Sequence, residues 1–275
     1  MRTRSRRPRA IRASPASEMD RASRKRLARL QKKEARAAAK YEKAKPSVFA
    51  SVQDKIPDGL RDKLETAFCK GFRLVFEKGD SLIGKTYNAE SLRQEYEENE
   101  QALSDRVTGR RLRRFTARSR AAVRGGTGIA LAEGAVLGVL GVGLPDIPLF
   151  LAGLLRGLYR IAQSCGFACE SEGERCYLLL LIAASLSKGE ERGRLSALAD
   201  DAAQALDRGG AYPLSLDACI DTAAARLADE MLAAKFVQGL PVVGIAGGLQ
   251  NVPVYRRVTS YAARAYEKRA LLRRG

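Results

Sequence analysis

One short stretch of the sequence has the residue types and spacing of a phosphate-binding loop. Residues 79–86 read GDSLIGKT and match the pattern G-x-x-x-x-G-K-[ST]. In such a loop the backbone amides surround the phosphates, Lys85 would contact the β- and γ-phosphates, and Thr86 would bind Mg²⁺. The candidate nucleotide-contacting residues are therefore Gly79, Gly84, Lys85 and Thr86.

The surroundings of this motif do not support nucleotide hydrolysis. A phosphate-binding loop follows a strand, but apolar residues recur every four positions before residue 79 and predict a helix over about 57–78. No apolar strand that ends in Asp follows the motif to supply a second magnesium ligand. We therefore keep nucleotide binding as an alternative function. The helical pattern consists of Leu60, Leu64, Phe68, Phe72 and Phe76.

The composition excludes several other kinds of catalytic and metal site. The chain contains no histidine, which excludes Ser-His-Asp triads, Cys-His dyads and histidine-based zinc sites. Its five cysteines lie in apolar surroundings, which predicts buried thiols in a reducing compartment, and their spacing matches no zinc pattern. We expect no catalytic residue, no metal and no cofactor, and therefore a protein that is not an enzyme.

The elements that would position any site are predicted to be helices. Aromatic residues make up only 6% of the chain, Trp is absent, and no stretch alternates between apolar and polar residues. Ser171 and Glu174 form a capping-box pattern before the apolar run CYLLLLIAASL, and Ser215 is a candidate N-cap. We expect an all-α helical bundle, with helices near 57–78, 89–103, 105–124, 149–166, 176–186, 195–206 and 216–231.

The positive charge is concentrated at one end of the chain. Residues 1–45 hold 17 Lys and Arg against 4 Asp and Glu, which leaves only +5 of the formal net charge of +18 for the rest. The first residues have no apolar run and are predicted to be disordered, and the following charged segment is predicted to be a solvated helix. We expect residues 1–45 to form a basic tail and residues 46–275 a single helical domain.

A short repeat suggests where two of the helices begin. Residues 143–150, GLPDIPLF, align with residues 248–255, GLQNVPVY, and each copy follows a Gly-rich apolar run. Asp146 and Asn251 occupy matching positions and are suited to cap a helix whose first turn contains Pro. The candidate turn and cap residues are Gly143, Pro145, Asp146, Pro148, Gly248, Asn251 and Pro253.

The two apolar segments that contain the repeat, 134–155 and 236–255, are long enough to cross a bilayer. Gly and Pro would break both helices, however, and lipid cannot satisfy the backbone groups that a break exposes. We therefore expect both segments to pack inside the protein, and we keep insertion into lipid as an alternative.

Basic helices lie next to both apolar segments, and such clusters are attracted to anionic lipid. Eight arginines lie within 106–124, and seven Lys and Arg lie within 256–274 against a single acid. The candidate anionic-lipid contacts are Arg106, Arg110, Arg111, Arg113, Arg114, Arg118, Arg256, Arg257, Arg264, Lys268 and Arg269.

Several of these motifs together resemble the EcsC family. The resemblance covers about residues 55–270 and rests on KGDSLIGKTY, on TGIALAEGAVLGVLGVGLPDIPLFLAGLLRGLYRIAQSCGF with the following GERCYLLLLIAAS, and on LPVVGIAGGLQNVPVYRRVTSYAARAYEKR. It implies a bacterial, largely helical protein named for an operon that also encodes an ABC transporter. The resemblance assigns no catalytic residue to this chain.

These observations predict a non-enzymatic, membrane-peripheral protein that assists membrane transport. Its partners would be an anionic membrane surface and a membrane transporter, and its place would be the cytoplasmic face of the cell membrane. The alternatives are a soluble cytoplasmic location, nucleotide binding through 79–86, and nonspecific nucleic-acid binding through the basic tail.

Overall fold

The computed structural model describes residues 21–44, 59–79, 89–105, 146–210, 214–237 and 252–273, together with Ala117. Every regular element within these residues is a helix, which confirms the predicted all-α fold. The elements are α1 (Arg21–Ala44), α3 (Leu60–Leu74), the π-helix η1 (Val75–Gly79), α5 (Ala89–Asp105), α7 (Asp146–Ser164), α8 (Glu172–Leu186), α9 (Gly189–Asp207), α10 (Leu216–Val237) and α11 (Val252–Leu272).

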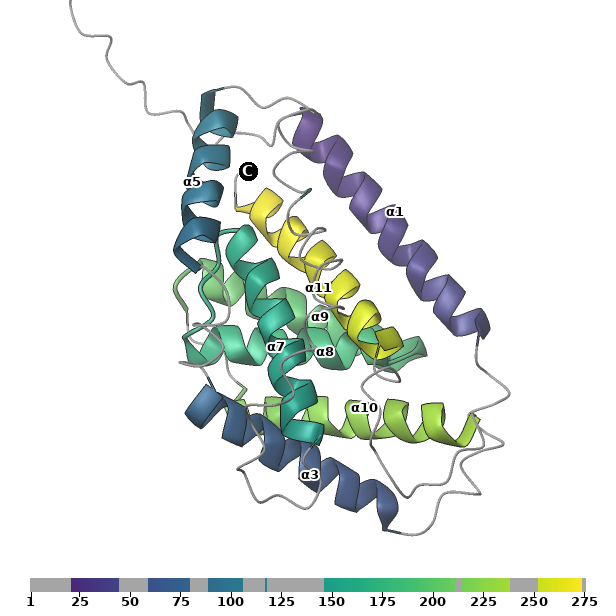
Figure 1. Cartoon of the computed structure of the whole chain (residues 1–275). Coiled ribbons are helices and arrows are strands. Elements are labelled where there is room, and N and C mark those ends of the chain that lie inside the picture. The colour runs from purple at the N-terminus through teal and green to yellow at the C-terminus, as the bar shows by residue number, and fades with distance from the viewer. Residues whose placement is uncertain are drawn as a thin grey trace, which may run out of the picture.

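Helix α8 forms the centre of the bundle, and α9, α10 and α11 pack around it (Figure 1). Every residue from Cys176 to Leu186 is buried, as expected for a helix that is apolar on all sides. Helices α3 and α10 pack together at one end of the molecule, α7 lies between α3 and α11, and α5 packs on α7.

Side-chain caps start two of these helices where the sequence predicts them. The Ser171 hydroxyl accepts a hydrogen bond from the Glu174 backbone N–H at 3.2 Å, and Ser215 does the same for Ala218 at 3.2 Å. The first cap is only half of a capping box, because the Glu174 carboxylate forms an ion pair with Arg269, 95 positions later in the chain.

Of the first apolar segment, 134–155, the structure describes residues 146–155, and these lie in α7. Helix α7 begins at Asp146, and the side chains of Ile147, Leu151, Leu154 and Leu155 are all buried in the core. This part therefore packs inside the protein, as the sequence suggests, whereas residues 134–145 and 238–251 lie outside the described residues. None of the described helices is both long enough and apolar enough to cross a membrane.

Helix α1 differs from the solvated helix that the sequence predicts. It packs along α11 at the outside of the bundle, and Leu30 on its inner side is only 2% exposed (Figure 1). At about 100° per residue, Ser23 and Leu30 share one side of the helix with Glu34, so a narrow stripe that includes an acid is enough to attach it. The helical half of the predicted tail is therefore part of the bundle.

Candidate functional site

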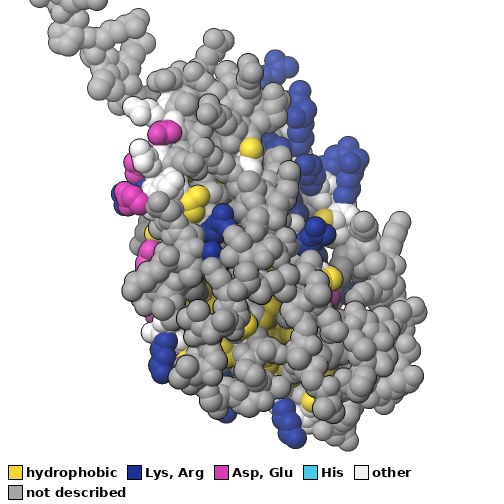
Figure 2. Space-filling view, viewed as in Figure 1, with side chains coloured by type: hydrophobic (Ala, Val, Ile, Leu, Met, Phe, Trp, Pro, Cys, Tyr) yellow, Lys and Arg dark blue, Asp and Glu magenta, His cyan; other side chains and the backbone are white. Residues whose placement is uncertain are grey.

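The outer side of α1 is a continuous row of cations. We call it the α1 cationic face, and all its members are exposed. Figure 2 shows Lys and Arg side chains along the edge of the molecule over α1, with no acidic side chains among them in this view. The α1 cationic face consists of Arg21, Arg24, Lys25, Arg29, Lys32, Lys33 and Arg36.

The inner side of α1 is held to α11 by charged as well as apolar contacts. Arg26 forms an ion pair with Glu267, which is nearly buried. Burial raises the pKa of the Glu267 carboxyl, although the hydrogen bond from Arg26 acts to lower it. One helix therefore presents an exposed cationic side and an inner side that binds the bundle.

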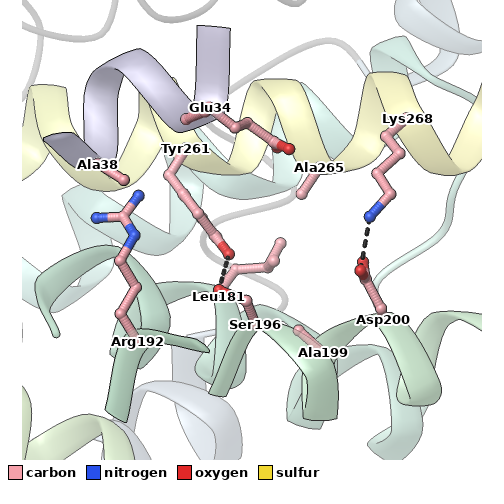
Figure 3. A pocket seen from close by; sticks show the side chains of 11 residues that line it. Glu34, Ala38, Leu181, Arg192, Ser196, Ala199, Asp200, Tyr261, Ala265 and Lys268 are labelled. Atoms are coloured by element: carbon pink, nitrogen blue, oxygen red, sulfur yellow. Dashed lines mark hydrogen bonds and ion pairs between the residues drawn. The ribbon is translucent and has the colours of Figure 1, made fainter. Parts of the chain in front are cut away.

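A pocket of about 220 Å³ lies beneath α1, between α1, α9 and α11, with α8 at its floor. We call it the α1–α9–α11 pocket (Figure 3). Its walls combine short apolar side chains with two acids, two bases and two hydroxyls. The lining residues are Glu34, Ala35, Ala38, Leu181, Arg192, Ser196, Ala199, Asp200, Tyr261, Ala265 and Lys268.

Two bonded pairs of polar groups link α9 to α11 in the wall of this pocket. Lys268 Nζ lies 2.6 Å from Asp200 Oδ2, and the Tyr261 and Ser196 hydroxyl oxygens are 2.9 Å apart. Burial raises the pKa of the Tyr261 hydroxyl, so it stays protonated at neutral pH. The Arg192 guanidinium carbon lies 5.3 Å from the centre of the Tyr261 ring, within the range of a cation–π contact.

A second polar cluster lies deep in the bundle and is structural. Arg269 is only 4% exposed and contacts the Asp207 carboxylate at 3.0 Å through two nitrogens and Glu174 at 2.7 Å. Its guanidinium carbon lies 4.2 Å from the centre of the Phe167 ring. The Arg269 guanidinium thus binds both carboxylates and lies against the ring, and it links α11 to α8 and to the C-terminal end of α9.

The α11 residues that the sequence suggests as lipid contacts do not form one outward face. Arg256 is exposed, but Arg257 pairs with Glu230 at 3.2 Å, and Arg264 is half-buried beside the Tyr261 ring. Lys268 pairs with Asp200, and the buried Arg269 cannot contact a membrane surface, so its assignment as a lipid contact is wrong. The cause is that α11 is packed among other helices, so three of its cations face acids on α8, α9 and α10.

The remaining predicted site residues are only partly described. Gly79 ends η1, so the residues before the GDSLIGKT motif are helical and not a strand. Asp146 is the first residue of α7, Pro148 is buried in its first turn, and Pro253 is exposed at the start of α11. The residues outside the described part of the chain are Gly84, Lys85, Thr86, Arg106, Arg110, Arg111, Arg113, Arg114, Arg118, Gly143, Pro145, Gly248 and Asn251.

The α1–α9–α11 pocket is absent from the sequence-based expectations. Its charged residues come from three helices, and Glu34 and Lys268 are more than 200 positions apart, so no local spacing reveals it. A signal for α1 does exist, because Leu27, Leu30 and Ala37 recur at helical spacing within the charged segment.

Comparison with known proteins identifies a family. The model of the EcsC protein family matches residues 21–271, which is nearly the whole described chain and includes α1. No curated protein and no solved structure matches the chain. The match begins at the first residue of α1 and ends within α11, so it spans the whole described bundle. The chain therefore belongs to the EcsC family.

Proposed function

We propose that this protein attaches peripherally to an anionic membrane surface through the α1 cationic face. The observation that supports the proposal most directly is the exposure of seven Lys and Arg on one side of a helix whose other side is bound to the bundle. Because α1 is already folded and anchored, these cations are pre-arranged as a row, and binding requires little further ordering of the helix.

The expected strength of this attraction is sufficient for reversible binding. Each Lys or Arg near an anionic membrane contributes about 1 kcal/mol. A face of seven cations therefore gives several kcal/mol, enough to hold a protein on a membrane but not to insert it. The arginines at 106–118 and the exposed Arg256 belong to the same proposal as further contacts.

The protein would act there as a non-enzymatic accessory or interaction factor for membrane transport, at the cytoplasmic face of the cell membrane. The lack of histidine in the chain and the helical residues before the GDSLIGKT motif support a role without hydrolysis. Family membership supports the association with transport, because the resemblance implies an operon that includes an ABC transporter.

Flotation with lipid vesicles tests the attachment. The full chain should float with phosphatidylcholine vesicles that contain phosphatidylglycerol and not with phosphatidylcholine alone. It should leave them in about 1 M salt, where the Debye length falls to about 3 Å. Replacing Lys25, Arg29 and Lys32 with Gln removes about 3 kcal/mol and should weaken binding about a hundredfold.

The matched control removes the same charge elsewhere. Lys63, Lys70 and Lys78 are exposed on α3 and η1, at the other end of the molecule, and their replacement with Gln should change binding little. Equal losses in the two variants would show that net charge, and not the α1 cationic face, drives attachment. Binding that resists salt and yields only to detergent would show insertion, and a preference for DNA over anionic vesicles would favour the nucleic-acid alternative.

A further inference from the structure

The α1–α9–α11 pocket contains two opposite charges, Glu34 and Arg192, that form no ion pair and no side-chain hydrogen bond among the described residues. Within the described residues, the Glu34 carboxylate accepts no hydrogen bond and lies in no ion pair. The Arg192 guanidinium, on the α9 side of the pocket, likewise has only its contact with the Tyr261 ring. All the other charged groups that line the pocket are paired, because Lys268 binds Asp200.

The geometry keeps Glu34 and Arg192 from neutralising each other. In Figure 3, Glu34 points from α1 toward Ala265 and Lys268, whereas Arg192 points toward Ala38 at the opposite end of the pocket. The two groups are not within ion-pair distance, although both are partly buried. A charge that is removed from water without a partner is costly, so the arrangement favours a molecule that satisfies both ends.

We propose that the α1–α9–α11 pocket binds a compact zwitterion, in which a short chain joins a primary ammonium to a phosphate or carboxylate. The ammonium would donate hydrogen bonds to Glu34, and the acidic group would accept a bidentate pair from Arg192. The Tyr261 and Ser196 hydroxyls and the alanine walls lie between these ends. This inference does not depend on the proposed membrane attachment.

The size of the pocket matches this class of ligand. A volume of about 220 Å³ is equivalent to about seven water molecules at about 30 Å³ each. It lies below the range of about 300–1,000 Å³ that holds drug-sized molecules, so it suits a molecule about as large as an amino acid. An inorganic anion would satisfy only Arg192, and a simple amine only Glu34.

The burial of Glu34 is consistent with this assignment. Burial raises the pKa of the Glu34 carboxyl, and the nearby Lys268, Arg264 and Arg192 act to lower it without overcoming the effect of burial. An ammonium placed against Glu34 would add a direct ion pair to the longer-range attraction of these three cations.

Calorimetric titration of the full chain with O-phosphoethanolamine tests the proposal. Inorganic phosphate and ethanolamine each carry half of the ligand, and phosphocholine lacks the N–H donors. Because one charged hydrogen-bonded contact contributes about 1.5–3 kcal/mol, each of these three should bind at least about tenfold more weakly than O-phosphoethanolamine. Heats no larger than dilution for O-phosphoethanolamine at millimolar concentration would overturn the proposal.

The variants distinguish the pocket from other sites. Glu34→Gln and Arg192→Gln should each weaken O-phosphoethanolamine binding by about tenfold or more. Glu190→Gln and Arg208→Gln remove the same charges from exposed positions of α9 and its C-terminal end, and should leave binding unchanged. Circular dichroism shows whether each variant is folded. Unchanged binding in folded Glu34→Gln and Arg192→Gln would place the ligand elsewhere and reject the pocket.

Two sources supply such a zwitterion, a free aminoalkyl phosphate or the headgroup of phosphatidylethanolamine. Vesicles of phosphatidylcholine with and without phosphatidylethanolamine separate them, and because both kinds are electrically neutral, the result is independent of the α1 cationic face. Recruitment by phosphatidylethanolamine that Glu34→Gln abolishes identifies the headgroup as the ligand. Binding of the free probe without such recruitment identifies a soluble molecule.

Discussion

At the scale of single residues, this protein uses arginine in two physically different ways. The arginines of the α1 cationic face are exposed and available to solvent, whereas Arg269 is buried and binds two carboxylates and an aromatic ring. The sequence shows that both kinds are cations, but it does not show their partners, because Asp207 and Glu174 lie 62 and 95 positions away from Arg269. For this reason a residue chosen as a lipid contact proves to be part of the core.

The first prediction at this scale concerns Arg269. Arg269→Ala would leave the buried Glu174 and the half-buried Asp207 without their main cation, so it should lower the free energy of unfolding by about 3–5 kcal/mol. Arg273→Ala removes a half-exposed arginine that contacts the same Asp207, and it should cost no more than about 1 kcal/mol. Urea unfolding measures both, and similar losses would contradict the special role of Arg269.

At the scale of elements, the helices themselves were largely predictable and their packing was not. Apolar periodicity and the Ser171 and Ser215 caps locate the starts of α3, α7, α8 and α10 within a few residues, and the glycine at 166 locates the end of α7. The structure extends α10 six residues beyond its predicted end, and α9 begins six residues before its predicted start. The predicted basic helix at 105–124 lies outside the described residues apart from Ala117. The docking of α1 was missed because Glu34 interrupts its apolar stripe, and only the fold shows that this side faces a pocket.

The prediction at this scale concerns the end of α7, where Gly166 adopts a φ of +82° and lies under the Tyr96 ring of α5. A Cβ at this position would come within 2.3 Å of the ring, in a conformation that alanine avoids. Gly166→Ala should therefore lower the thermal midpoint. Gly193→Ala in α9 meets no atom within 4 Å and should raise stability by about 0.5–1 kcal/mol. Calorimetry measures the thermal midpoint of both variants. A higher midpoint for Gly166→Ala would be inconsistent with close docking of α5.

At the scale of the whole molecule, all five cysteines are free and buried, as the sequence suggests. Burial raises the pKa of the Cys165 thiol to about 12. It also raises the pKa of the Cys69 thiol to about 11, with a further contribution from the hydrogen bond to Asp221. The reactive thiolate form of both residues is therefore scarce at neutral pH even where a reagent has access.

The thiols should accordingly report on unfolding of the whole bundle. The native protein should react with an aromatic disulfide reagent only slowly at about pH 8, and the rate should rise with denaturant in step with the loss of helical circular dichroism. A thiol that reacts rapidly before the helical signal changes would reveal a part of the bundle that opens separately.

The pairing of α1 with α11 also sets the order in which the protein can complete its fold. The first described helix needs the last one as its partner, and 228 residues are added between the end of α1 and the end of α11. At about 5–20 residues per second, the ribosome needs roughly 10–45 s for this interval. During that time the most cationic of the described helices is already made but has no bundle to join. Synthesis, and not helix formation, therefore limits how soon the pocket beneath α1 can close.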